Sequence, residues 1–116
     1  MATANAAATL ERADDFAADY ATATLTILDG ATTLATHTLA NFTTSNSGAD
    51  GVATANAIAD ATIAASGTAD GATLTAAGKT YTLTLGTSGT DVIVSTTNYV
   101  SGETSSVNSF VVTFPA

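Results

Sequence analysis

The chain has 116 residues and a formal net charge of −8, because ten acidic residues stand against Arg12 and Lys79. Two basic residues cannot neutralise a run of phosphates, so we expect neither nucleic acid nor an anionic membrane surface as a partner. The absence of cysteine excludes disulfides, thiolate metal sites and thiol catalysis.

Large side chains are scarce in this sequence. It contains 26 Ala and 25 Thr, but only four Phe, three Tyr and no Trp. A buried Leu or Phe contributes about 1.5–3 kcal/mol, whereas Ala contributes far less. A few residues must therefore carry the core, and a partner or a homo-oligomer is expected to add stability. The predicted core residues are Leu25, Ile27, Leu34, Leu39, Leu83, Ile93, Phe110 and Val112.

The N-terminal part predicts a flexible arm over residues 1–8 and a single domain over 9–116. A helix is expected at about 9–21, with Thr9 as its N-cap and acidic residues in its first turns. Helical spacing places four apolar residues on one face and a fifth on its flank. These residues are Leu10, Ala13, Ala17 and Tyr20, with Phe16 beside them.

From Thr22 the pattern changes to the alternation that is typical of strands. Residues 22–28 and 32–39 predict a hairpin around the Asp29-Gly30 turn. Residues 42–44 could extend this pairing, and residues 45–51 predict a loop. Residues 52–68 favour a long strand or a bent pair of strands, and a helix remains the alternative because of their Ala content.

The C-terminal half continues the β pattern. Residues 72–76 and 79–85 predict a second hairpin, and residues 91–95 and 106–114 predict two paired strands. In the last strand, Phe110, Val112 and Phe114 alternate with smaller or more polar residues. The predicted fold is mainly β: an antiparallel β-sandwich, jelly-roll or immunoglobulin-like, of about seven or eight strands with one short N-terminal helix.

His37 is the one histidine, so a nucleophile–base pair of the Ser/His type would have to use it. It lies in a predicted strand between Thr36 and Thr38, and no nucleophile-elbow pattern occurs in the chain. We therefore expect a partly exposed strand residue and no enzymatic activity. One histidine without cysteine also argues against a zinc site.

The acidic residues allow two further kinds of site. Asp29, Asp50, Asp70 and Asp91 could in principle gather around Ca²⁺, but Asp-Gly is also the ordinary chemistry of a β-turn, which we favour. On the predicted helix, Asp14, Asp15 and Asp19 predict a solvated acidic face. Residues 41–43 fit a glycosylation sequon, although residues 1–10 do not predict a secretory signal.

Residues 86–89 are glycine-rich, but no Gly-Lys-Thr and no helix follow them, so they do not predict a phosphate loop. The sequence thus predicts no catalytic residue, no metal site and no cofactor.

Several short sequence words, in their order and spacing, resemble a family of small virion structural proteins of tailed bacteriophages and prophages. The words are GVATANAI at 51–58, ASGTA at 65–69, GTSGTD at 86–91, Gly102 and SFVVTFP at 109–115. The chain departs from the family pattern after its first strand, where Asp29-Gly30 replaces a Gln-Pro turn. It also departs in residues 72–85, which carry Tyr81 in place of an aromatic-basic pair.

The resemblance implies a component of a phage particle, made in the bacterial host cytoplasm and located in the virion, with no catalytic residues. We expect a capsid decoration (cement) protein that is present in many copies and binds the lattice of the major capsid protein or other virion proteins. A minor protein of the tail or the head–tail connector is the alternative. A receptor- or carbohydrate-binding β-sandwich module is a third hypothesis, for which three Tyr and no Trp offer few stacking surfaces.

Overall fold

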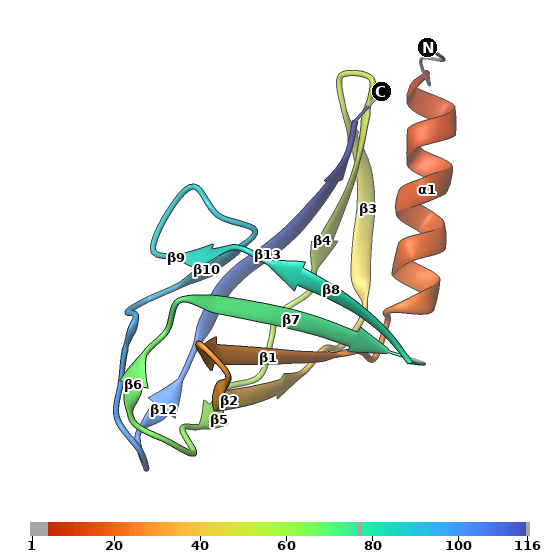
Figure 1. Ribbon diagram of the computed structural model, residues 1–116. Coiled ribbons are helices and arrows are strands. Elements are labelled where there is room, and N and C mark those ends of the chain that lie inside the picture. The colour runs from red at the N-terminus through yellow and green to blue at the C-terminus, as the bar shows by residue number, and fades with distance from the viewer. Residues whose placement is uncertain (1–4, 77, 116) are drawn as a thin grey trace.

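The computed structural model describes residues 5–76 and 78–115 as one helix and two main sheets (Figure 1). Helix α1 spans Ala6–Asp19. The four-stranded sheet has the order β2 (Thr32–Thr38), β1 (Thr24–Asp29), β7 (Gly71–Ala76) and β8 (Lys79–Leu83). The five-stranded sheet has the order β3 (Phe42–Ser47), β4 (Asp50–Ala55), β13 (Val107–Phe114), β10 (Val92–Val94) and β9 (Leu85–Gly86).

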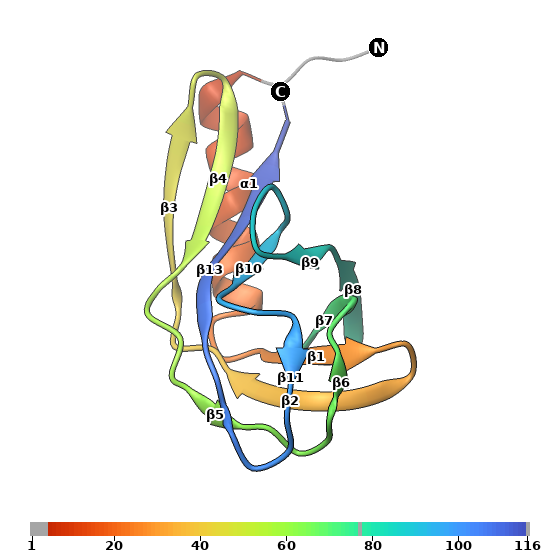
Figure 2. The ribbon, with the colours of Figure 1, turned by 90° about the vertical axis from the view of Figure 1, so that its left-hand side faces the viewer.

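Two small pairs of strands lie at the end of the molecule away from α1 (Figure 2). They are β5 (Ala61–Thr62) with β12 (Thr104–Ser105), and β6 (Gly67–Thr68) with β11 (Asn98–Tyr99). The mainly β fold of packed sheets with one N-terminal helix is confirmed, and eight of the described strands have three or more residues. One pairing differs from the expected antiparallel pattern, because β9 and β10 run parallel.

Helix α1 begins three residues earlier than predicted. Asn5, not Thr9, is its N-cap, since the Asn5 side chain accepts a hydrogen bond of 3.0 Å from the backbone N–H of Ala8. Residues 6–8 of the predicted arm are therefore helical, whereas residues 1–4 lie outside the described part. Thr9 is fully buried inside the helix, and its hydroxyl donates a 2.6 Å hydrogen bond to the Ala49 carbonyl.

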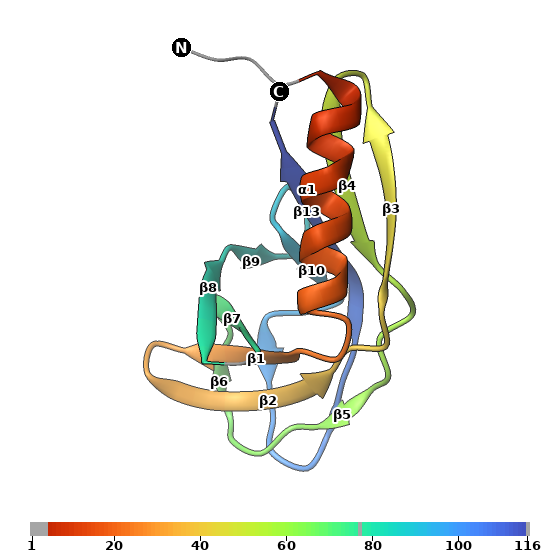
Figure 3. The same cartoon turned by 90° about the vertical axis from the view of Figure 1, so that its right-hand side faces the viewer.

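The helix packs unusually close to the five-stranded sheet, along β3, β4 and the end of β13 (Figure 3). A Cβ atom added to Gly51 of β4 would lie 2.0 Å from the backbone oxygen of Thr9. Ala13 on the helix and Ala53 on β4 are both fully buried. Small residues at these positions let the two backbones approach, which explains part of the high Ala content.

The segment predicted as a loop, residues 45–51, is instead the turn end of a hairpin. Strands β3 and β4 pair from Phe42 with Ala55 to Ser47 with Asp50, and Gly48 with φ of 62° makes the turn. The turn at Gly48 therefore lies inside the predicted loop, and strands extend into the loop from both sides. Residues 52–68 form no helix: they hold the rest of β4 and the short strands β5 and β6.

The core largely follows the predicted residues. Leu25, Ile27, Leu34, Leu39, Leu83 and Phe110 are buried. Ile93 is only half-buried, because the inward residues of β10 are its neighbours Val92 and Val94, one position away in the alternation. Val112 is likewise half-buried at the edge of the core. The core also contains Phe16, Tyr20, Phe42, Leu74 and Tyr99.

Candidate functional site

A groove of about 260 Å³ lies where α1, β8 and the end of β13 meet, and we call it the aromatic groove. It is lined by Arg12, Asp15, Phe16, Asp19, Tyr20, Lys79, Tyr81 and Phe114. Segments from the beginning, the middle and the end of the chain build it. It therefore exists only in the folded protein.

Local structure explains how each element supplies its part. Four residues of α1 and its C-cap Tyr20 stand at positions i, i+3, i+4, i+7 and i+8, so they share one stripe of the helix. Lys79 and Tyr81 are two residues apart on β8 and point to the same side of the sheet. Phe114 is the last residue of β13 and lies opposite Gly51, next to the helix.

The aromatic rings form one connected cluster. Phe16 stacks on Tyr20 with ring centroids 4.7 Å apart, and it meets Phe114 at 5.6 Å. Tyr81 contacts both helix rings at steep angles, with centroids 5.8 Å from Phe16 and 5.4 Å from Tyr20. Phe16 and Tyr20 are nearly buried, whereas Tyr81 is 47% exposed. The helix rings thus form a rigid floor that holds the exposed Tyr81 ring in place.

The surroundings of the groove also change the acidity of the Tyr20 phenol. Burial raises the pKa of Tyr20, and the neighbouring Tyr81 and Asp19 raise it further. Both effects oppose a negative charge on the Tyr20 phenol. Tyr20 therefore remains protonated, and able to donate a hydrogen bond, to a higher pH than an ordinary tyrosine.

The charges of the groove balance within it. Both basic residues of the chain and two of its ten acidic residues line it, so its formal charge is zero. Lys79 lies 3.9 Å from Asp19 in an exposed ion pair. Among the described residues, none forms an ion pair or hydrogen bond with the Arg12 guanidinium. The groove thus offers Arg12 donors and carboxylate acceptors around an aromatic surface.

His37 does not occupy the partly exposed position predicted for it, because it is 1% exposed. Its Nδ1 lies 2.9 Å from the Ala59 carbonyl oxygen, and its Nε2 lies 2.8 Å from Ser105 Oγ. Ser105 Oγ in turn lies 3.3 Å from the Tyr99 hydroxyl. The fold therefore joins β2, the 59–60 loop, β11 and β12 through one buried polar network.

The chemistry of this network follows from its partners. The Ala59 carbonyl oxygen can only accept a hydrogen bond, so His37 Nδ1 donates to it. No carboxylate stands behind Nδ1 as in a catalytic triad, and Ser105 is only 2% exposed. The network satisfies buried polar groups on elements that are far apart in the chain. The absence of enzymatic activity remains a prediction.

The acidic turns bind backbone groups. Asp70 Oδ1 accepts from the Gly30 N–H at 3.0 Å, and Asp29 Oδ2 accepts from the Thr68 N–H at 3.3 Å, so two predicted turns lie side by side. Asp91 Oδ2 accepts from the Thr84 N–H at 3.1 Å. Within residues 5–76 and 78–115, no three His, Asp or Glu residues gather closely enough to hold a metal ion.

The remaining predicted features lie on the surface or in turns. Asp14, Asp15 and Asp19 are exposed, as expected; Asp14 accepts a hydrogen bond from Thr44, and the other two line the groove. Asn41 of the sequon is held at a φ of 84°, and its own side chain accepts from the next backbone N–H. The glycine-rich residues 86–89 lead into strand β10.

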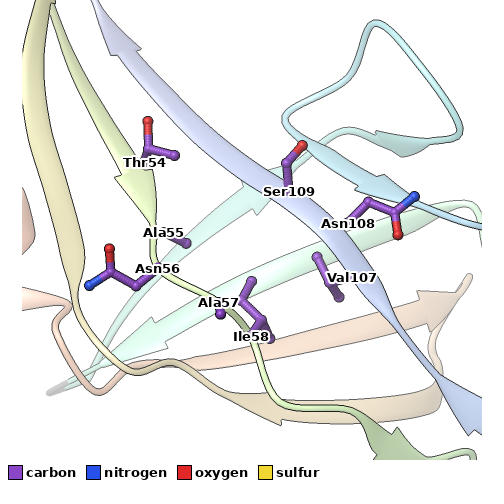
Figure 4. A pocket seen from close by; sticks show the side chains of 8 residues that line it. All are labelled: Thr54, Ala55, Asn56, Ala57, Ile58, Val107, Asn108 and Ser109. Carbon is purple, nitrogen blue, oxygen red and sulfur yellow. The ribbon is translucent and has the colours of Figure 1, made fainter.

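A second hollow, of about 310 Å³, opens where β4 and β13 diverge (Figure 4). Its lining is Thr54, Ala55, Asn56, Ala57, Ile58, Val107, Asn108 and Ser109. None of these residues carries a charge or titrates near neutral pH. The hollow can therefore accept small apolar groups or hydrogen bonds, but it offers no acid–base chemistry.

Sequence reasoning did not identify the aromatic groove. It predicted Phe16 and Tyr20 on one helix and Tyr81 on a strand, with nothing to bring them together. The sequence carries no local signal for the groove, because its lining residues come from three separate segments. Among the residues described, no helix has the length and apolar character that crossing a membrane requires.

Comparison with known proteins gives no relative, since no family model, curated protein or solved structure matches this chain.

Proposed function

We propose that this chain is a structural component of a tailed-phage virion, most simply a capsid decoration protein that binds the lattice of the major capsid protein. The proposal begins with the sequence words that resemble small virion proteins. Two of them fall largely on neighbouring strands, GVATANAI on β4 and SFVVTFP on β13, whereas GTSGTD has only Gly86 in β9 and otherwise forms the turn into β10. Words that lie far apart in the chain thus meet at one sheet.

The observation that carries the proposal is the outer face of that sheet. The helix and the core cover its inner face, where Phe42, Ala53, Val92 and Phe110 are buried. The opposite face, which we call the outer face, presents uncharged side chains along the middle of its strands. These are Thr43, Ser45, Val52, Thr54, Ile93, Ser109, Val111 and Thr113, and each is exposed or half-buried.

An uncharged sheet face is notable on a chain of net charge −8. Charged residues are depleted at the centres of protein interfaces, because burying an unpaired charge is costly. Asp50 and Asp91 stand only at the ends of these strands. The outer face is therefore suited to lie flat against another protein, and many copies would bind by repeating the same contact.

The direct test is the copy number of the chain in purified particles, measured by quantitative mass spectrometry. We expect many copies in a fixed ratio to the major capsid protein, located on the head. Six or twelve copies would contradict decoration and favour the connector or tail. Absence from the particle would contradict a virion role altogether.

A pair of matched variants tests the outer face. Thr113→Lys puts a charge on it, whereas Thr36→Lys puts the same charge on an exposed threonine of β2. We expect Thr113→Lys to lower occupancy on the particle by about tenfold, the factor that corresponds to 1.4 kcal/mol. Thr36→Lys should keep normal occupancy, and equal losses in both variants would contradict docking through this face.

A further inference from the structure

We infer that the aromatic groove is a binding site for a neutral saccharide ring, separate from the outer sheet face. The site would take one sugar ring of a glycan against Tyr81 and Phe114, with the ring hydroxyls held by Arg12 and Asp15. This inference goes beyond the virion proposal and does not depend on it. Four observations support it.

The first observation is the exposed aromatic surface. Tyr81 is the most exposed large apolar side chain among the described residues, at 47%, and Phe114 beside it is half-buried. The C–H face of a pyranose is apolar and packs on such a ring. Contacts from Phe16 and Tyr20 fix the Tyr81 ring, so little conformational entropy is lost when a ligand binds.

The second observation is the arrangement of polar groups. A sugar hydroxyl both donates and accepts hydrogen bonds, and the groove supplies partners of both kinds. The Arg12 guanidinium only donates and the Asp15 carboxylate only accepts. Among the described residues, neither group is in a hydrogen bond or ion pair with another side chain. Both are therefore available to a ligand, whereas Lys79 and Asp19 already pair with each other.

The third observation is charge. The groove is formally neutral, while the remaining eight acidic residues of the chain lie elsewhere with no basic residue among them. An anionic ligand would be repelled by that surrounding field. A cationic ligand would be drawn to the acidic surface at large instead of to this groove. A neutral ligand rich in hydroxyls is the one that the groove favours.

The fourth observation is size. A groove of about 260 Å³ lies just below the range of roughly 300–1,000 Å³ that is typical of sites for drug-sized ligands. It can hold one ring, but not a whole oligosaccharide. The rest of a glycan would extend over the surface, so affinity is expected to be modest.

The test uses the purified full chain and three neutral oligosaccharide probes: hexamers of α-linked glucose, β-linked glucose and N-acetylglucosamine. Binding is followed by amide chemical shifts in NMR. We expect at least one probe to shift residues of α1, β8 and the end of β13. A sulfated glycan of the heparin type is the anionic comparison, and it should bind more weakly.

Three variants connect binding to the groove. Tyr81→Ala should weaken binding by about tenfold or more, since about 1.4 kcal/mol corresponds to that factor. Tyr81→Phe keeps the ring and should retain most of the affinity. Val100→Ala is the matched control, because Val100 is also an exposed apolar residue, at 44%, but lies outside the groove.

Several results would overturn the inference. They are no binding by any of the three neutral probes to a folded protein, equal binding by wild type and Tyr81→Ala, and stronger binding of the sulfated glycan. Self-association that depends on Tyr81, seen by sedimentation velocity, would assign the groove to a second copy of the chain instead. None of these results changes the copy number in particles, so failure here is distinct from failure of the virion proposal.

Discussion

The two ends of the molecule are held together by different physics. At the helix end, α1 lies on β4 with almost no space between the backbones. The rings of Phe16, Phe42 and Phe114 pack against one another beside this contact. At the opposite end, where β5, β6, β11 and β12 are only two residues long, a hydrogen-bonded network through His37, Ser105 and Tyr99 crosses the core. A cavity of about 90 Å³ remains beside Ser105.

The difference shows how a sequence poor in large side chains can be stabilised. Close contact between small residues gives many weak dispersion contacts, but it allows no added atom. A buried polar network needs few large side chains, but each member depends on its partner. The helix end should therefore be sensitive to added volume, and the opposite end to lost hydrogen bonds.

The largest effect is expected from Gly51→Ala at the helix end. The new Cβ would meet the Thr9 backbone oxygen at 2.0 Å, and a backbone atom cannot move aside without shifting α1. We expect a loss of at least about 3 kcal/mol in the free energy of unfolding, measured with urea. Gly71→Ala is the control, because nothing lies within 4 Å of its added Cβ. Equal stabilities of the two variants would argue against the close helix–sheet contact.

At the opposite end, Ser105→Ala should cost about 1–3 kcal/mol, because the His37 Nε2 and the Tyr99 hydroxyl lose a buried partner. Ser88→Ala, at an exposed loop serine, should change stability by less than about 0.5 kcal/mol. Combining Ser105→Ala with His37→Phe should cost less than the sum of the single changes. Strict additivity of the two would contradict a coupled network.

A smaller effect is expected from Tyr81→Ala, which removes two ring contacts from the aromatic groove. Such pairs contribute about 0.5–1.5 kcal/mol each beyond burial, and the exposure of Tyr81 favours the low end. Thermal unfolding should show a modest decrease relative to Val100→Ala. If the decrease exceeds that of Ser105→Ala, the groove is a main structural support, and its role as a binding site becomes less plausible.

The smallest effect depends on pH and concerns Tyr20. Its pKa is raised in the folded state, so the protonated phenol is favoured by folding. The resulting stability is complete below the ordinary tyrosine pKa of 10.0 and is lost as pH rises through the higher folded-state value. Ultraviolet titration should show Tyr20 ionising above that value, and Tyr20→Phe should remove the corresponding fall in stability. A Tyr20 that ionises at or below 10.0 would contradict its burial.

The sequence by itself determined which segments alternate between apolar and polar residues, and where most turns fall. Thr24–Asp29 and Thr32–Thr38 pair around Asp29-Gly30 as predicted, because the period-two pattern and the turn dipeptide act over a few residues. It did not determine the start of the helix, since Asn5 and Thr9 are both good caps and only the docking of Thr9 on Ala49 decides between them. Local rules also predicted a loop over residues 45–51, where β3 and β4 pair on both sides of Gly48.

Both candidate surfaces were decided by the tertiary structure. The uncharged outer face needs β4, β13 and β10 side by side, and the aromatic groove needs Tyr81 and Phe114 each in contact with the Phe16 ring. His37 became a core residue only because Ser105, 68 positions later, folds against it. Alternation and turn chemistry are local, so the sequence alone could predict strands. Contacts between distant residues depend on how those strands pack, and here these contacts decide where the chain can bind.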